Sequence, residues 1–226
     1  MLIYIIRHGI TAWNRLKKTQ GTINIPLEQE GIDLAVATGR VLSDLHIDVC
    51  YTSPLLRAKQ TALGMLKGQS DHGEVLTPAF TEQADHWIAR DGRVIPVIEE
   101  PRIREINFGT LEGSVYMDEN RNVLSKEMDV FFKNPRQFAR PEKGENIADI
   151  EERTAEFWKE LIQDPALQNR TVLVSSHGCA VRALLQNVYE EKESFWHGCV
   201  PPNCSISIVE VKDGKAKLLE HDKIFY

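Results

Sequence analysis

The sequence has little of several features that would place it in a special class of protein. Its 226 residues include four cysteines, which form no CxxC pair and show no spacing typical of metal ligands. We therefore expect reduced thiols, no disulfide framework and no metal site. No apolar run approaches the length of a membrane span, and Arg7 interrupts the first one too early for a signal peptide. These absences predict a cytoplasmic protein without a membrane partner.

An excess of basic residues is also missing. The formal net charge is -6, from 27 Lys and Arg against 33 Asp and Glu. This balance argues against general nucleic-acid binding, although it leaves room for a local basic pocket. With 42% hydrophobic residues, the chain can bury a full core, and its length suits one large α/β domain or two small ones.

Short apolar runs of strand length alternate with helical patterns along most of the chain. Strands are expected at 2–6, 47–52, 101–108, 171–175, 205–211 and 216–220, and helices at about 28–45, from 53 onward, and at 116–132, 146–163 and 179–188. Asp213-Gly214 is the expected turn of the last hairpin. This alternation predicts a single domain over residues 1–226, a three-layer α/β/α fold with a mostly parallel central sheet.

Three regions fit this alternation less well. Residues 12–21 are expected to form a loop. The segment at about 68–100 is rich in glycine and proline, and we expect irregular structure there with one short helix near 81–89. Within this variable segment, Trp87 either roofs a pocket or belongs to a solvated loop. The segment at about 110–145 is expected to be a helical cap insertion over the edge of the sheet where the carboxyl ends of the parallel strands lie.

Three of the expected strands end abruptly in charged or titratable residues. Arg7-His8-Gly9 ends the first strand, Arg57 lies just after the second, and His177-Gly178 follows the strand at 171–175. In an open parallel sheet, ligands bind beyond the carboxyl ends of the strands. Two arginines and two histidines that meet there would form a metal-free site for a phosphate dianion, because arginine offers a planar fork of donors. The alternative is a set of solvated charges.

These residue types also suggest a reaction. A histidine nitrogen can attack phosphorus and form a covalent intermediate, which water then discharges because a P–N bond is more labile than a P–O bond. The departing alkoxide needs a proton, and Glu105 is the candidate for the general acid that supplies it and later activates water. Alternatively, Glu105 pairs with Arg102 or Arg104.

Five motifs, in one order along most of the chain, support a more specific interpretation. They are Arg7-His8-Gly9-Ile10-Thr11-Ala12-Trp13-Asn14 with Gln20-Gly21, Thr52-Ser53-Pro54-Leu55-Leu56-Arg57-Ala58, Arg104-Glu105-Ile106-Asn107-Phe108-Gly109 with Glu112-Gly113, Gly144-Glu145-Asn146, and Ser176-His177-Gly178. Together they resemble the histidine phosphatase, or phosphoglycerate mutase-like, superfamily and its RHGxTxxN signature.

The resemblance implies a role for each site residue. By this resemblance His8 is the phosphorylated nucleophile and Glu105 the proton donor. The residues that would bind the transferring phosphoryl group are Arg7, Arg57 and His177. The residues that would line the same pocket as substrate contacts are Thr11, Asn14, Gln20, Gly21 and Gly178, the last by letting the backbone approach.

The resemblance implies a metal-independent phosphatase of the histidine acid type, which hydrolyses a small phosphorylated metabolite without a cofactor. A mutase or phosphotransferase would use the same residues but pass the phosphoryl group to an organic acceptor. A non-catalytic phosphate-binding module is the third hypothesis. A glycolytic mutase is disfavoured, because Glu105 lies in Arg-Glu-Ile-Asn-Phe-Gly and not in Glu-Arg-His-Tyr-Gly. The substrate and the oligomeric state stay open, with a homodimer as one alternative.

Overall fold

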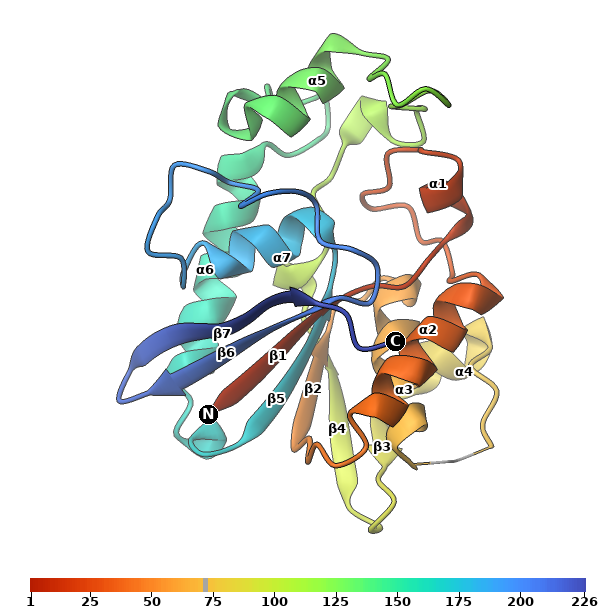
Figure 1. Cartoon of the computed structure of the whole chain (residues 1–226), viewed down its shortest axis with the longest axis vertical. Coiled ribbons are helices and arrows are strands. Elements are labelled where there is room, and N and C mark those ends of the chain that lie inside the picture. Colours follow the sequence, from red (N-terminus) through yellow and green to blue (C-terminus); the bar gives the residue numbers. More distant parts are fainter. Residues whose placement is uncertain (71–72) are drawn as a thin grey trace.

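A seven-stranded mixed sheet forms the centre of the computed structural model, which describes residues 1–70 and 73–226 (Figure 1). The strand order is β3-β4-β2-β5-β1-β6-β7. Its strands are β1 (Leu2–Arg7), β2 (Val49–Thr52), β3 (His86–Ile88), β4 (Val94–Glu99), β5 (Thr171–Ser176), β6 (Ile206–Lys212) and β7 (Lys215–Lys223). The four strands from β4 to β1 run parallel, and the outer strands pair antiparallel. The expected α/β fold with a parallel centre is therefore confirmed.

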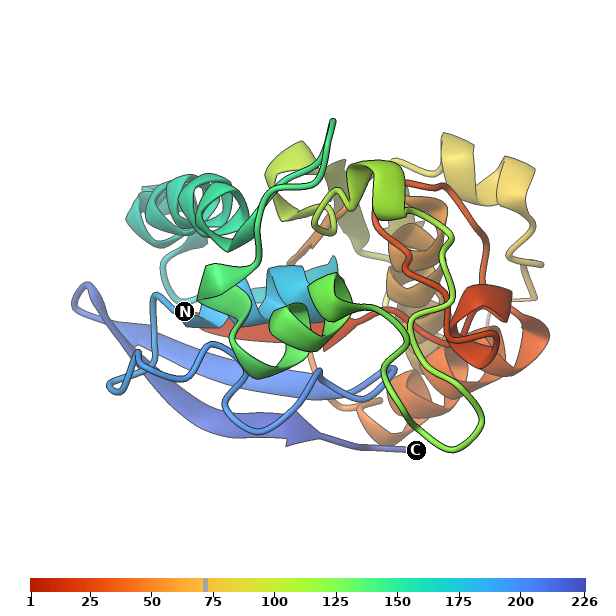
Figure 2. The ribbon, with the colours of Figure 1, turned by 90° about the horizontal axis from the view of Figure 1, so that it is seen from above.

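Helices cover both faces of this sheet, as Figure 2 shows for α6 and α2 on opposite sides of the molecule. The helices are α1 (Ala12–Arg15), α2 (Gln29–Val41), α3 (Leu56–Ser70), α4 (Pro78–Gln83), α5 (Lys126–Lys133), α6 (Ile147–Gln163) and α7 (Gly178–Leu185). Successive side chains of a strand point to opposite faces. Ile5 of β1 accordingly packs in one core cluster with Phe157 of α6, whereas Ile6 packs in the other with Leu63 of α3.

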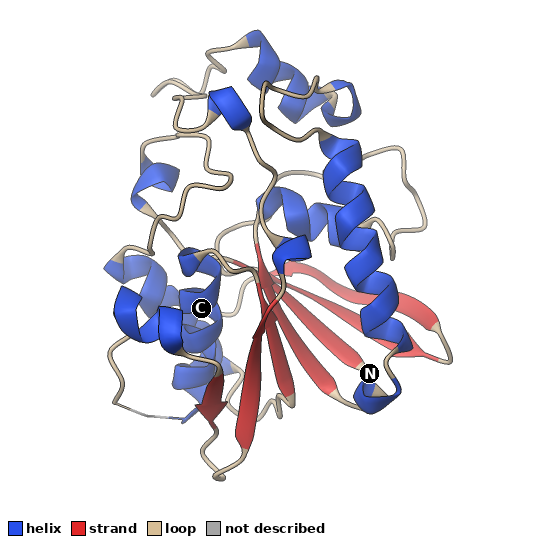
Figure 3. Ribbon diagram, turned by 180° about the vertical axis from the view of Figure 1, so that it is seen from behind, coloured by secondary structure: helices blue, strands red, loops and turns tan. Residues whose placement is uncertain are grey.

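Helix α6 forms where its sequence pattern predicts, and it lies in front of the sheet in the rear view of Figure 3. Asn146 caps it: the side chain of Asn146 accepts from the backbone N–H of Asp149 at 3.1 Å, and Asp149 accepts from the N–H of Asn146 at 2.8 Å. The apolar residues on its inner face are buried. Local capping and helical periodicity agree here, which is why both ends were predictable.

The strand expected at 101–108 is wrong. Pro101 begins a short 3-10 helix, Pro101–Ile103, and residues 104–108 that follow have no regular secondary structure and pair with no strand. Proline suits the first position of a helical turn because its missing N–H is not needed there. Three backbone carbonyls of this segment accept hydrogen bonds from the guanidinium of Arg153 instead of from a neighbouring strand.

The variable segment holds more regular structure than its composition predicts. Helix α4 begins and ends earlier than the helix expected near 81–89 and overlaps it only at 81–83, and β3 and β4 form an antiparallel hairpin. Trp87 is only 4% exposed, and its indole N–H donates to the Ser70 hydroxyl at 2.7 Å, so it neither roofs the pocket nor lies in a solvated loop. Asp71 and His72, which fall in the predicted segment, lie outside the described residues.

Residues 12–21 and 116–132 also differ from their expected structure. The loop expected at 12–21 contains the short helix α1, which Thr11 caps. The helix expected at 116–132 shrinks to α5, and Leu124 lies outside it and is exposed. In Figure 1, α5 lies above the sheet, beyond the carboxyl ends of the parallel strands. The division into one domain with a cap insertion stays a prediction.

The described residues contain no helix long and apolar enough to cross a membrane.

Candidate active site

The expected convergence of strand ends is present in the structure. Arg7 of β1 lies in register with Ser176 of β5, and Thr52 of β2 with Ser175. The residues that follow these strands therefore meet at one edge of the sheet. The rings of His8 and His177 lie 5.2 Å apart between centroids.

His8 is buried, and its ring is held in an uncharged form. Its Nδ1 lies 2.7 Å from the carbonyl oxygen of Gly9, to which an Nδ1–H would donate, so that Nε2 keeps its lone pair. Burial lowers the pKa of His8 well below its usual value, and the charges of Arg57 and Arg7 add to this effect. A neutral imidazole with a free Nε2 is the form that can attack phosphorus.

Two arginines approach His8 from different elements. Arg57, in the first turn of α3, is fully buried, and its terminal nitrogens donate to the carbonyl oxygens of Ile23 at 2.9 Å and Gly21 at 2.7 Å. Burial lowers its pKa to about 10, so the guanidinium still carries its charge at neutral pH. Arg7 donates to the carbonyl oxygen of Pro201. Both cations are thus held by neutral carbonyls and keep charge to offer to a ligand.

Several buried donors of the predicted site have no partner in the protein. Among the described residues, the unpartnered buried nitrogens include Nε of Arg7, Nε2 of Gln20, Nε of Arg57 and Nδ1 of His177. Nε2 of His177 lies 2.8 Å from the Ser53 hydroxyl, which leaves Nδ1 to carry the ring proton if Ser53 donates. Buried donors without an acceptor are rare in folded proteins. An oxyanion with several acceptor oxygens would satisfy them.

Glu105 lies where its carboxyl group can exchange protons. Its oxygens accept from the backbone N–H groups of Ile106 at 3.0 Å, Cys179 at 3.1 Å and Ala180 at 3.1 Å, the last two at the start of α7. Burial raises its pKa, against the opposite effect of the Ile106 and Cys179 amides and of the two arginines. A raised pKa suits a general acid.

The alternative partners of Glu105 are engaged elsewhere. Arg102 pairs with Glu100 and Glu160, and Arg104 pairs with Glu145. The interpretation of Glu105 as a simple ion-pair partner of either arginine is therefore wrong.

Gly178 lies between the guanidinium of Arg7 and the carboxyl group of Glu105. A Cβ at this position would lie 2.7 Å from a methyl carbon of Val200, 3.6 Å from Nε of Arg7 and 3.7 Å from Oε2 of Glu105. Any side chain would therefore collide with Val200 and fill the space between the two functional groups.

The remaining predicted substrate contacts divide into two groups. Asn14 and Gln20 line the pocket beside His8. Thr11 is fully buried, and its hydroxyl donates to Oε1 of Gln20 at 2.6 Å. Gly21 contributes its carbonyl to Arg57. Thr11 and Gly21 thus hold other site residues in place.

Sequence reasoning missed residues that support the site from outside the motif cores. Oxygens of the Glu112 carboxylate accept from the backbone N–H groups of Gly21 at 3.0 Å and Thr22 at 2.9 Å. The Asn203 amide nitrogen donates to the carbonyl oxygens of His8 at 2.9 Å and Gly9 at 3.1 Å. The supporting role of Glu112 could have been predicted, because Glu112 belongs to one of the five sequence motifs. Asn203 follows two prolines in a loop, where no sequence pattern indicates such a role.

Aromatic side chains form the outer wall of the pocket. The space beside His8 is small, about 80 Å³, and an adjoining hollow of about 440 Å³ shares four lining residues with it. The shared residues are Tyr116, Phe132, Trp196 and Val200. The group attached to a bound phosphate would therefore meet a largely apolar surface.

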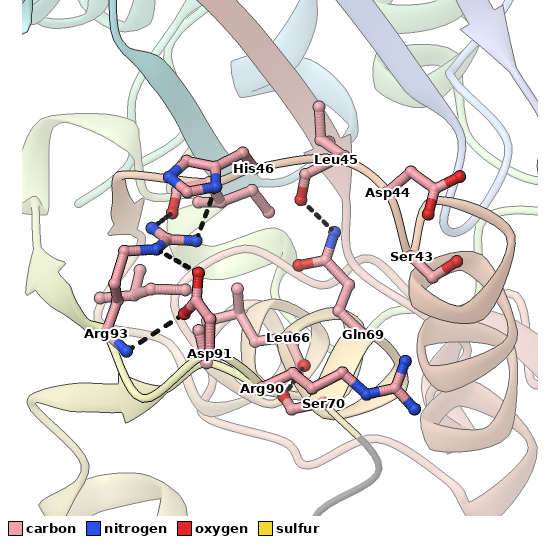
Figure 4. Close-up of a pocket in the computed structure, with 13 residues that line it drawn as sticks. Ser43, Asp44, Leu45, His46, Leu66, Gln69, Ser70, Arg90, Asp91 and Arg93 are labelled. Atoms are coloured by element: carbon pink, nitrogen blue, oxygen red, sulfur yellow. Dashed lines mark hydrogen bonds and ion pairs between the residues drawn. The ribbon is translucent and has the colours of Figure 1, made fainter.

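A separate hollow of about 440 Å³ lies at the amino ends of β2 and β4, away from the predicted site residues (Figure 4). Several of its polar side chains bond to the protein itself. Arg93 contacts Asp91 at 2.8 Å and His46 at 2.9 Å, and Gln69 donates to the carbonyl oxygen of Leu42 at 2.7 Å. These contacts contrast with the unpartnered donors around His8. The described residues hold no group of three or more His, Cys, Asp or Glu that could ligate a metal ion.

Comparisons with known proteins agree with this geometry. Residues 3–84 and 80–223 match the model of the histidine phosphatase superfamily (branch 1). The chain is 30% identical over 199 residues to a 2,3-bisphosphoglycerate-dependent phosphoglycerate mutase of Chlamydia felis, covering 84% of this chain and 85% of the relative.

Solved structures with the same fold include Bacillus stearothermophilus YhfR, with a TM-score of 0.78, 26% identity and coverage of 99% of this chain and 97% of the other. A phosphoserine phosphatase mutant of Entamoeba histolytica, in complex with phosphoserine, has a TM-score of 0.71 at 23% identity and covers 99% and 97% of the two chains.

Proposed function

The chain belongs to the histidine phosphatase superfamily, and from this premise we propose that it is a phosphatase that hydrolyses a small phosphomonoester through a phosphohistidine at His8. One observation carries the proposal: the four buried, unpartnered nitrogens of Arg7, Gln20, Arg57 and His177 are contributed by the residues that the motifs identify. Their arrangement suits the oxygens of a phosphoryl group, whose charge the two guanidinium groups balance.

The reaction then takes two steps. Nε2 of His8 attacks phosphorus, the P–O bond to the alcohol breaks, and the protonated carboxyl of Glu105 gives its proton to the departing oxygen. Water next attacks the phosphohistidine, and the Glu105 carboxylate takes a proton from it. The P–N bond breaks, His8 regains its lone pair, and the products are the alcohol and inorganic phosphate.

Replacing His8 by Ala tests this proposal directly. Turnover of an aryl phosphate should disappear, and wild-type protein denatured at alkaline pH during turnover should carry an acid-labile, base-stable phosphoryl group that the variant lacks. His86→Ala, on the exposed surface of β3, is a matched control that should keep both. Undiminished turnover by His8→Ala contradicts the proposed mechanism. Tight phosphate binding by the wild type without any turnover would favour a non-catalytic binding module instead.

A mutase is the second candidate, because the relative from Chlamydia felis bears that name. The same residues would pass the phosphoryl group from His8 to a second hydroxyl group of the substrate. Such a transfer needs a site that excludes water. Product analysis with a phosphoglycerate distinguishes the two: inorganic phosphate supports the phosphatase, and a positional isomer supports the mutase.

The aromatic wall of the pocket bears on the substrate. A phosphomonoester with an apolar or aromatic alcohol group would bury that group against Tyr116, Phe132 and Trp196. A panel of phosphorylated metabolites, scored by phosphate release, tests this preference against phosphoglycerate. Location in the cytoplasm, a homodimer and the absence of nucleic-acid and membrane partners stay predictions from the sequence.

A further inference from the structure

The segment Cys199–Asn203 approaches the phosphate site from the C-terminal part of the chain. It connects α7 to β6, in the blue part of Figure 1. Val200 lines the pocket, the carbonyl oxygen of Pro201 accepts from a terminal nitrogen of Arg7, and Asn203 donates to the carbonyls of His8 and Gly9. The segment therefore contacts the backbone of the nucleophile and the side chain of one phosphate-binding cation.

The contact at Pro201 decides where Arg7 can point. Nε of Arg7 is buried and has no partner, whereas a terminal nitrogen is fixed by the Pro201 carbonyl. A guanidinium is planar, so fixing one terminal nitrogen restricts the direction of the other N–H groups. Any displacement of Pro201 would release this restriction.

The segment itself has no regular secondary structure that would hold it. Just before and after it, the backbone takes positive φ values of 46° at His197, 112° at Gly198 and 56° at Cys204. For the two residues with side chains, His197 and Cys204, such conformations persist only where surrounding contacts enforce them. Asn203 supplies one anchor at the C-terminal end, and the N-terminal end requires another.

Arg182 supplies that second anchor. It lies on α7 and is fully buried, and its Nε and one terminal nitrogen both donate to the carbonyl oxygen of Cys199, at 3.2 and 2.6 Å. The same terminal nitrogen donates to Asp222 of β7, and the other one donates to Tyr189 at 3.2 Å and His221 at 2.8 Å. Asp222 already balances the charge of Arg182. The two hydrogen bonds to the Cys199 carbonyl are therefore not needed to neutralise this charge, and they hold the backbone at Cys199 instead.

We infer that Arg182 is a positioning residue for phosphate binding, which acts through the Cys199 carbonyl and Pro201 on the guanidinium of Arg7. The inference rests on the proposed function, because it concerns how Arg7 is held for a phosphoryl group. Arg182 itself lies behind the segment and is not among the pocket-lining residues. Its effect on the site should therefore depend on the presence of Arg7.

A double-mutant cycle with inorganic phosphate as the ligand tests this dependence. Arg182→Lys keeps a charge for Asp222 but loses the fork to the Cys199 carbonyl, and Arg182→Met loses both. Measured by calorimetry with Arg7 present, each should weaken phosphate binding by roughly 10-fold or more, the size of a lost charge-assisted contact. In an Arg7→Met background, the same substitutions should change binding by less than about 3-fold.

Two comparisons separate positioning from a loss of fold stability. Leu161→Ala creates a cavity in the core at the far end of α6 and should lower the melting temperature without any coupling to Arg7. Asn203→Ala frees the other end of the segment without touching the buried charge, and it should also couple to Arg7. If Arg182→Met does not fold, Arg182→Lys and Asn203→Ala still decide the question.

Equal losses in the wild-type and Arg7→Met backgrounds would overturn the inference, as would an unchanged affinity of Arg182→Lys for phosphate. The cycle uses binding and not turnover. A protein that binds phosphate with the expected coupling but hydrolyses no ester would therefore refute the proposed function and leave the inference standing.

Discussion

Two uncharged histidines beside two arginines are the main feature of the site at the scale of single residues. Burial lowers the pKa of both His8 and His177 well below the usual value, and Arg57 lowers them further. For His8 the result is a lone pair ready for attack. The lowered pKa values also make the free energy of unfolding depend on pH, because these histidines bind protons in the unfolded chain but not in the folded site.

The first prediction concerns this linkage. As pH falls below the ordinary histidine value of about 6.5, the unfolded state gains protons and the folded state does not, so stability is lost. Each such histidine contributes a slope of up to about 1.4 kcal/mol per pH unit. His177→Asn, which cannot titrate, should reduce the slope of the unfolding free energy by up to that amount. Urea unfolding at several pH values between about 5 and 7 measures it, with the exposed His86→Asn as the control. An unchanged slope in His177→Asn would contradict the shift.

The second prediction concerns Glu105. Glu105→Gln removes the proton donor, so hydrolysis of alkyl phosphates should fall by about 10²–10⁴-fold, the usual contribution of general acid catalysis. An activated aryl phosphate, whose leaving group needs no proton, should lose much less. Because burial raises the pKa of Glu105, wild-type activity on alkyl phosphates should fall as pH rises through that pKa. Steady-state rates for both ester classes measure this, and equal losses on the two would argue against an acid role.

At the scale of elements, a helix or strand could be predicted from the sequence when the residues that determine it lie within that element. The ends of α6 were predictable because Asn146 caps the helix and its apolar positions share one face. Glu105 was placed on a strand because the residues around it look extended. In the structure the side chain of Arg153, which is distant in sequence, donates hydrogen bonds to backbone carbonyls of that segment. No pattern within residues 101–108 could show this, because the partner lies in α6.

The third prediction follows from Arg153. Its guanidinium donates to the carbonyl oxygens of Arg102, Arg104 and Glu105, at 2.6, 2.7 and 3.0 Å. Arg153→Met should let the segment shift and should lower the rate for alkyl phosphates by about 10–10²-fold, as expected for a misplaced catalytic group. Aryl phosphates should be affected less, since they depend less on Glu105. Arg170→Met, which breaks a surface ion pair with Asp48, serves as the control. A matching loss in that control would point to general destabilisation.

At the scale of the whole molecule, the site joins parts of the chain that are far apart in sequence. The motifs predicted which of these parts meet, since His8, Arg57, Glu105 and His177 converge as expected. They did not predict what holds them together. Asn203 and the other supporting groups act through backbone groups, which nearly every residue type has, so no sequence pattern marks their targets.

The fourth prediction is that inorganic phosphate stabilises the entire fold. A ligand that binds only the folded state at 100 times its dissociation constant adds about 2.7 kcal/mol to the free energy of unfolding. Thermal melts with increasing phosphate should show a rising melting temperature, and Arg57→Met should lose most of the rise. Chloride at matched ionic strength is the control. An equal rise with chloride, or a full rise in Arg57→Met, would mean that the anion binds elsewhere.

The position of β1 in the sheet has a consequence for synthesis on the ribosome. Leu2 pairs with Thr171 on one side and with Glu210 on the other, so β1 cannot gain both of its neighbours until β5 and β6 have emerged. Contacts between such distant residues slow folding and leave β1 exposed meanwhile. Until then, a nascent chain carries His8 without the later groups that surround it in the folded site, such as His177 and Asn203. The site would become complete only after these later segments have been synthesised.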